Sequence, residues 1–202
     1  MSKPRLAIDC DDVVLEHHRL LMNFHNKEYG TVLTYEGSHT FDLCVLWNCS
    51  KETKTERLGK FLRSPEQLTL PLVKGASEAL NILNERFELH LVTAREPRLR
   101  EITLQVLKNH HVVDLFVESH FLGFDFNDPL PHLSKALLCK KLGVVGLVDD
   151  GHHNAVDAAK VGIPVYLPDR PWNRSPDYPG IVRVRDWAET IQKIFAHANL
   201  PA

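Results

Sequence analysis

Short apolar runs alternate with segments of helical periodicity along most of this chain. The runs span residues 5–9, 87–93, 115–117, 144–149 and 164–167. Each is apolar on both faces, as is typical of parallel strands that helices cover on both sides. Helical spacing of apolar residues follows at 76–83, 99–106, 155–162 and 187–195, and Asp186 is placed to cap the last of these helices. The alternation predicts an α/β fold, a Rossmann-like, doubly wound parallel sheet built from βαβ units.

One segment interrupts the alternation. From about residue 17 to residue 69 the chain has no strand-like run, although apolar residues at helical spacing mark two short amphipathic helices, near 20–24 and 58–62. We expect residues 17–69 to form a helical cap inserted after the first strand, and residues 1–16 and 70–202 to form the core. The length of 202 residues suits one domain with such an insert.

Charge, apolar content and cysteine spacing restrict the partners. The 24 Lys and Arg residues nearly balance the 26 Asp and Glu residues, which argues against a nucleic-acid polymer or a membrane surface as partner. The apolar runs are too short for a signal peptide or a membrane span, and the four cysteines form no CxxC pair. We therefore expect a soluble, cytoplasmic protein with reduced cysteines. The 12 histidines are scattered or adjacent in pairs, and we expect no zinc site.

Polar side chains gather where the apolar runs end. The first run ends in Asp9, Cys10, Asp11 and Asp12, another in Thr93, Ala94 and Arg95, and a third in Asp149 and Asp150. Ligands of open α/β sheets bind at the carboxyl ends of the strands, where these residues would meet. Helix capping would explain one aspartate, but not two clusters. Five carboxylates at one edge repel one another unless a cation is present, and Mg²⁺ prefers such oxygen ligands.

These residues resemble the motifs of a known family. An apolar strand followed by DxDxV at residues 6–13, a strand-terminal Thr93, a downstream lysine and the late Asp149-Asp150 pair are similar to the four motifs of the haloacid dehalogenase (HAD) superfamily. The resemblance covers residues 4–16 and 70–170. Residues 93–95, 135–143 and the Pro-Trp-Asn-Arg segment at 171–174 resemble its 5′(3′)-deoxyribonucleotidase-like branch.

The resemblance implies a role for each residue. Asp9 would be the nucleophile that forms an aspartyl-phosphate, and Asp11 the general acid and base. Mg²⁺ would be held by the Asp9 carboxylate, the Asp11 backbone carbonyl and Asp149, with Asp150 orienting a bound water. Apart from the resemblance, we expect Asn154 to support the loop that contains Asp149 and Asp150. The phosphate would be bound by Thr93, Ala94, Arg95 and Lys135.

Asp11 also favours one reaction over another. An alkoxide leaving group needs a proton, whereas a halide does not, so an acid at position 11 favours phosphate-ester cleavage over dehalogenation. The resemblance implies a Mg²⁺-dependent phosphatase for a small phosphorylated metabolite, with nucleoside monophosphates among the candidates. The alternatives are a HAD-type phosphotransferase and a non-catalytic HAD-like protein that binds a ligand.

The cap would supply substrate contacts and exclude water. Its candidates for stacking on a base or ring are Phe24, His25, Phe41 and Trp47. Two readings remain open: Phe24 and Phe41 could instead form the cap's own core, with His25 at the surface. For Trp47 the two readings are evenly balanced, because it stands in the least regular part of the insert.

Overall fold

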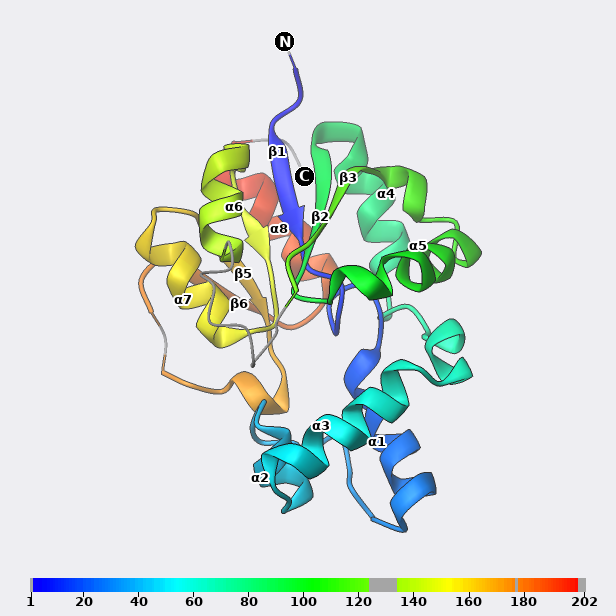
Figure 1. The fold of residues 1–202 in the computed structure, drawn as a ribbon. Coiled ribbons are helices and arrows are strands. Elements are labelled where there is room, and N and C mark those ends of the chain that lie inside the picture. Colours follow the sequence, from blue (N-terminus) through cyan, green and yellow to red (C-terminus); the bar gives the residue numbers. More distant parts are fainter. Residues whose placement is uncertain (1, 124–133, 177, 200–202) are drawn as a thin grey trace.

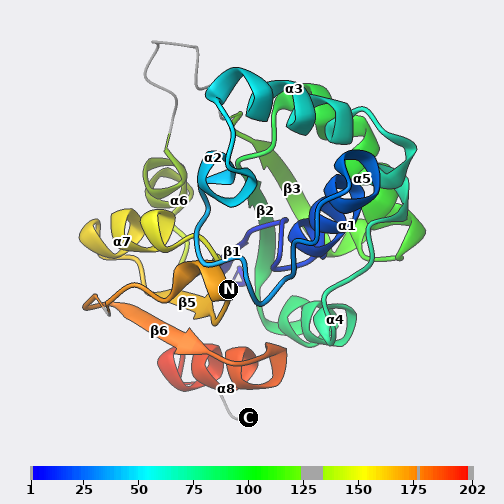
Figure 2. The same ribbon diagram turned by 90° about the horizontal axis from the view of Figure 1, so that it is seen from below.

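The computed structural model describes residues 2–123, 134–176 and 178–199, and their strands form one parallel sheet. The strand order is β3-β2-β1-β4-β5-β6, and helices lie on both sides of the sheet (Figures 1 and 2). This confirms the predicted α/β, Rossmann-like class. The strands are β1 (Arg5–Ile8), β2 (Glu88–Thr93), β3 (Phe116–Phe121), β4 (Leu147–Val148), β5 (Val165–Pro168) and β6 (Ile181–Val184).

Two apolar cores explain why the strands are apolar on both faces. Leu6 and Ile8 of β1 pack on one side of the sheet, and Ala7 between them packs on the other. The first core includes residues of α4 (Ala76–Arg86), α5 (Arg100–Asn109) and α8 (Trp187–His197); the second includes residues of α6 (Lys135–Leu142) and α7 (His152–Lys160). None of the helices described is long and apolar enough to cross a membrane.

Two core helices begin at polar residues whose side chains cap the helix N-terminus. The Asp186 carboxylate accepts a hydrogen bond from the Glu189 backbone N–H at 2.9 Å, which confirms the expected cap of α8. Ser134 caps α6 in the same way and so fixes where Lys135 begins that helix.

The strand predictions differ from the structure at β3, β4 and β6. β3 extends to Phe121, beyond the predicted 115–117, because Glu118, Ser119 and His120 pair with β2 although they interrupt the apolar run. β4 covers only Leu147–Val148 of the predicted 144–149. β6 was not predicted, since it is a half-exposed edge strand that carries an arginine.

The cap segment, residues 17–69, lies beyond the carboxyl ends of the strands (Figure 1). It contains α1 (His17–Tyr29), α2 (Leu43–Trp47), α3 (Lys51–Leu62) and the short 3₁₀ helix η1 (Pro65–Thr69), and it has an apolar cluster of its own. The prediction that Trp47 stands in irregular chain is wrong, because Trp47 is the last residue of α2, a short helix whose N-terminus Asp42 caps. The division into cap and core at these boundaries stays a prediction.

Sheet pairing places two histidines side by side that their positions in the sequence do not connect. His90 of β2 and His120 of β3 are far apart in sequence, yet their ring nitrogens Nδ1 and Nε2 are 3.4 Å apart. A scan for adjacent or helically spaced histidines misses this pair because the parallel register of β2 and β3 brings the two rings together.

Candidate active site

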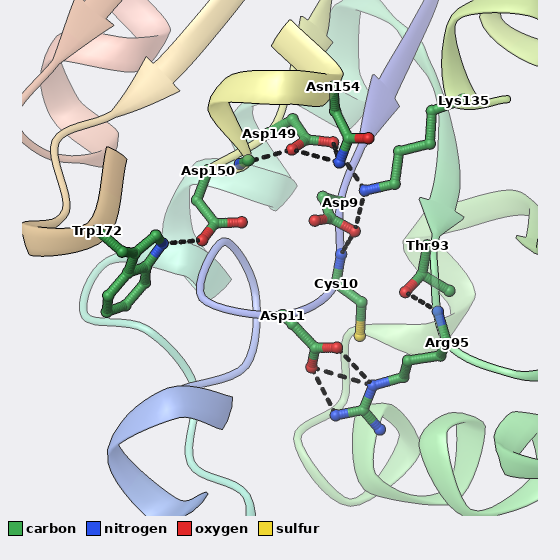
Figure 3. A network of polar contacts seen from close by, with 11 residues as sticks. Asp9, Cys10, Asp11, Thr93, Arg95, Lys135, Asp149, Asp150, Asn154 and Trp172 are labelled. Atoms are coloured by element: carbon green, nitrogen blue, oxygen red, sulfur yellow. Dashed lines mark hydrogen bonds and ion pairs between the residues drawn. The ribbon is translucent and has the colours of Figure 1, made fainter. Parts of the chain in front are cut away.

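Asp9 is the first residue after β1, and its side chain is 8% exposed. One carboxylate oxygen, Oδ1, accepts a hydrogen bond from the Cys10 backbone N–H at 2.7 Å and lies 2.8 Å from Nζ of Lys135. The same ammonium lies 2.7 Å from Oδ2 of Asp149 (Figure 3). Lys135 therefore joins the ends of β1 and β4.

The loop after β4 fixes Asp149 in this position. Oδ1 of Asp149 accepts hydrogen bonds from the Gly151 backbone N–H at 2.7 Å and from Nδ2 of Asn154 at 3.2 Å. The Asn154 contact confirms its expected support of this loop. A Cβ at position 151 would stand 2.9 Å from Oδ1 of Asp149 and 2.8 Å from Nδ2 of Asn154, so a larger residue here would displace these two side chains.

Asp150 is held by the segment that follows β5. Its Oδ2 accepts a hydrogen bond from the indole Nε1–H of Trp172 at 2.8 Å, and its backbone carbonyl accepts one from Nδ2 of Asn173 at 2.8 Å. Both donors belong to the short 3₁₀ helix η4 (Pro171–Asn173). These contacts were not predicted, although the Pro-Trp-Asn-Arg segment that carries them stood out in the sequence.

The acidic cluster comprises Asp9, Asp149 and Asp150, whose carboxylate oxygens lie within 4.8 Å of one another. Burial, more than any neighbour, raises the pKa of Asp9 to about 7 despite the charge of Lys135. Burial also raises the pKa of Asp150, and nearby Asp12 adds to the effect. When all three carboxylates are ionised, one ammonium leaves two negative charges uncompensated. This donor set fits a divalent cation that prefers oxygen.

Asp11 points away from the acidic cluster and toward Arg95 (Figure 3). Nε and Nη2 of Arg95 donate to the Asp11 carboxylate at 3.0 and 2.6 Å, and Nη1 donates to Oγ1 of Thr103 at 2.9 Å. Burial would raise the pKa of Asp11, but the charges of Arg95 and His17 lower it to about 2. In this arrangement Asp11 is ionised and its side chain is not among the clustered ligands, so a backbone role in metal binding stays a prediction.

Thr93 ends β2 and is buried beside this pair. Its Oγ1 accepts a hydrogen bond from the Arg95 backbone N–H at 3.1 Å, which shapes the turn that contains Ala94. Phosphate binding by Thr93, Ala94, Arg95 and Lys135 stays a prediction.

Three of the four cap candidates, Phe24, His25 and Trp47, are buried within the cap segment. His25 stacks on Trp47 with ring centres 4.4 Å apart, and its Nε2 lies 3.1 Å from Nη1 of Arg57. Phe24 packs against Phe61 at 5.3 Å. The alternative placement of His25 at the surface is wrong, since it is 1% exposed. Substrate contact by Phe24, His25 and Trp47 stays a prediction.

Other aromatic rings of the cap segment pack against Trp172, whose indole donates to Asp150 of the acidic cluster. The ring cluster consists of Trp172 with His18, Tyr35 and Phe41, at centre-to-centre distances of 4.3, 5.3 and 5.8 Å from the indole. His18 and Tyr35 were missed as candidates because nothing in the linear sequence connects them to position 172.

Comparison with solved structures identifies the class of fold. No family model matches the chain. A haloacid dehalogenase-like family hydrolase from Streptococcus pneumoniae superposes with a TM-score of 0.67 at 14% identity, over 95% of this chain and 98% of that one. The HAD-hydrolase YfnB from Bacillus subtilis, described as bound to magnesium, superposes with a TM-score of 0.62 at 13% identity, over 99% and 100%. The chain therefore has the HAD-like fold.

Sequence comparison adds relatives that match along nearly the whole chain. "Putative nucleotidase BH1399" from Halalkalibacterium halodurans is 28% identical over 192 residues, covering 93% of this chain and 91% of that protein. "Putative nucleotidase YqfW" from Bacillus subtilis is 25% identical over 189 residues, covering 93% and 92%. These relatives agree with the nucleotidase-like branch that the motifs resemble.

Proposed function

We propose that this protein is a Mg²⁺-dependent phosphatase that hydrolyses a small phosphate monoester, with nucleoside monophosphates as the first substrates to test. The observation that carries the proposal is the buried contact of Asp9 with Lys135 beside Asp149 and Asp150. The HAD-like fold and the names of the relatives support the reaction class.

The two oxygens of Asp9 have different surroundings, which favours one of them as the attacking atom. Oδ1 is bound by Lys135 and by the Cys10 backbone N–H. Oδ2 has no hydrogen-bond partner in the described parts of the chain, so it is the oxygen available to form a bond to phosphorus. As that bond forms, the ester P–O bond breaks, and the leaving oxygen takes a proton from Asp11.

The second step returns the enzyme to its starting state. Asp11 takes a proton from water, the water oxygen bonds to phosphorus, and the bond between phosphorus and Asp9 breaks to release inorganic phosphate. A bound Mg²⁺ would supply positive charge at Asp9, Asp149 and Asp150 that lets the anionic nucleophile approach an anionic ester. Because Arg95 holds Asp11 ionised, the acid step needs Asp11 to separate from Arg95 and take up a proton.

A phosphate-release screen tests the proposal. Purified protein is given nucleoside monophosphates, sugar phosphates and small phosphorylated acids, with Mg²⁺ or with EDTA. We expect Mg²⁺-dependent release that is lost in Asp9→Asn and Asp11→Asn but kept in Asp157→Asn, a matched change at an exposed position of α7. Folded wild-type protein that releases no phosphate from any of these esters would contradict the proposal. Transfer to added alcohols that exceeds hydrolysis would favour the phosphotransferase instead.

A further inference from the structure

A second group of metal-binding side chains lies outside the acidic cluster. The His–Glu cluster consists of His90 on β2 with Glu118 and His120 on β3, and one potential ligand atom of each lies within 4.8 Å of the others. None of these residues belongs to the motifs that resemble the HAD superfamily. The two strands meet at an edge of the sheet, since β3 is its terminal strand (Figure 2).

A β-bulge brings the three side chains to one face of the sheet. Leu89 pairs with Phe116, but the next residue, His90, pairs with Glu118, so Val117 is the extra residue on β3. Without the bulge, Glu118 would pair with Leu91 and share its face, which is apolar. With it, Glu118 lies beside His90, and His120, two residues on, faces the same way.

The spacing of the three ligand atoms matches a tetrahedral metal site. Nδ1 of His90 lies 3.4 Å from Nε2 of His120. Oε2 of Glu118 lies 3.3 Å from Nε2 of His120 and 3.7 Å from Nδ1 of His90. A tetrahedral Zn²⁺ with ligands at about 2.0–2.2 Å needs separations of about 3.3–3.6 Å between them. Two of the three distances lie in this range and the third is slightly longer.

Burial and access are also suited to a bound ion. His90 is 4% exposed, and burial lowers its pKa, so its ring is neutral and its nitrogen can act as a ligand at neutral pH. Glu118 is open to solvent and borders a surface groove of about 540 Å³ that also reaches His120. An ion can therefore enter from solution and meet one buried and two accessible ligands.

We propose that His90, Glu118 and His120 form a Zn²⁺ site that ties the edge strand β3 to β2. Two imidazoles and a carboxylate are a ligand set that suits zinc, and they leave one tetrahedral position for water. The ion would stabilise the pairing of β2 and β3 by binding Nδ1 of His90, Oε2 of Glu118 and Nε2 of His120. The site is independent of the proposed phosphatase reaction.

Cobalt spectroscopy distinguishes this site from the acidic cluster. The full-length protein, stripped of metal and held in excess Mg²⁺, is titrated with Co²⁺, whose tetrahedral complexes absorb visible light far more strongly than octahedral ones. We expect one equivalent of strongly absorbing Co²⁺ that Zn²⁺ displaces. Glu118→Gln and His120→Gln should weaken Co²⁺ binding at least tenfold, whereas His39→Gln, at an exposed histidine outside the cluster, should not.

Thermal unfolding gives a second readout on the same proteins. Zn²⁺ should raise the melting temperature of the wild type and of His39→Gln but not of Glu118→Gln or His120→Gln, all measured in excess Mg²⁺. Both partners chosen for substitution are at least partly exposed, so the variants should fold, which circular dichroism checks. A weak octahedral spectrum in the wild type, or a strong band that survives in both cluster variants, would overturn the proposal.

Discussion

Lys135 places one ammonium between two buried carboxylates, and its own side chain is 4% exposed. Burial alone would lower the pKa of Lys135, but the charges of Asp149 and Asp9 raise it, so the lysine stays charged. The ammonium and the carboxylates thus stabilise each other's ionised forms. Removing the ammonium would leave buried negative charges without a partner, which costs far more than losing an exposed ion pair.

Lys135→Met should therefore destabilise the metal-free protein by about 3–5 kcal/mol at pH 8, the typical effect of breaking a buried pair. The loss should shrink at pH 6, because burial raises the pKa of Asp9 to about 7 in the wild type although Lys135 lowers it; without this ammonium the pKa rises further, and Asp9 can take up a proton. Urea unfolding in EDTA at the two pH values measures this. Lys140→Met, on the exposed side of the same helix, is the matched control and should change stability little. Equal losses in both variants would contradict the argument.

His18 gives a second prediction, on acid stability. Burial and the neighbouring His17 lower the pKa of His18 to about 3. Below the ordinary histidine pKa of about 6.5, His18 is protonated in the unfolded chain but stays neutral in the folded protein. The free energy of unfolding therefore falls as the pH drops from 6.5 toward 3. The contribution has a limit of about 1.4 kcal/mol per pH unit.

His18→Phe keeps a ring against Trp172 and removes the titration. The free energy of unfolding should therefore fall less steeply between pH 6.5 and 4.5 in the variant than in the wild type. Urea titrations at several pH values measure the two slopes. His39→Gln, which removes an exposed histidine, should keep the wild-type slope. If His18→Phe leaves this slope unchanged, another group is responsible for the loss of stability between pH 6.5 and 4.5.

At the scale of elements, η4 supports the loop after β4. The indole of Trp172 donates to Oδ2 of Asp150, and Asn173 donates to the Asp150 backbone carbonyl. Groups that hydrogen-bond to metal ligands hold those ligands in position, and their loss typically weakens metal binding by about 10- to 100-fold.

Trp172→Phe should therefore weaken Mg²⁺ binding by about 10- to 100-fold while leaving the fold intact. Isothermal titration with Mg²⁺ measures the affinity directly. Trp187→Phe is the matched control, because its buried indole N–H also donates one hydrogen bond, to the Val13 carbonyl, and does not touch the acidic cluster. Equal weakening in both variants would mean that the effect is general to buried tryptophans.

The elements also explain which parts of the molecule could be predicted from sequence. The five predicted strands and the core helices α4, α5, α7 and α8 were found because each buries an apolar face with a clear period. β6 and the full length of β3 were missed because edge strands carry polar residues, as Glu118 and His120 do. The meeting of Lys135 with Asp9 was expected only through the family resemblance, whereas the orientation of Asp11 toward Arg95 depends on side-chain contacts that no linear pattern encodes.

At the scale of the whole molecule, the cap segment has its own apolar cluster and meets the core next to the acidic cluster. The ring cluster lies at this junction: Tyr35 and Phe41 come from the cap segment, and Trp172 comes from η4. Phe41 also contacts His153 of α7, with ring centres 5.7 Å apart. The ring contacts between the cap segment and the core can therefore change while the core keeps its stability.

Phe41→Ala tests this separation. Loss of ring contacts worth about 0.5–1.5 kcal/mol should lower kcat/KM for the best phosphate monoester by about 2- to 13-fold, because the cap segment would close less tightly over the acidic cluster. The midpoint of urea unfolding should change little, since Phe41 is 42% exposed and belongs to neither core. Val45→Ala, at an exposed position of α2, should leave both quantities unchanged. If Phe41→Ala instead lowers the unfolding midpoint strongly and kcat/KM stays the same, Phe41 stabilises the fold and does not contribute to catalysis.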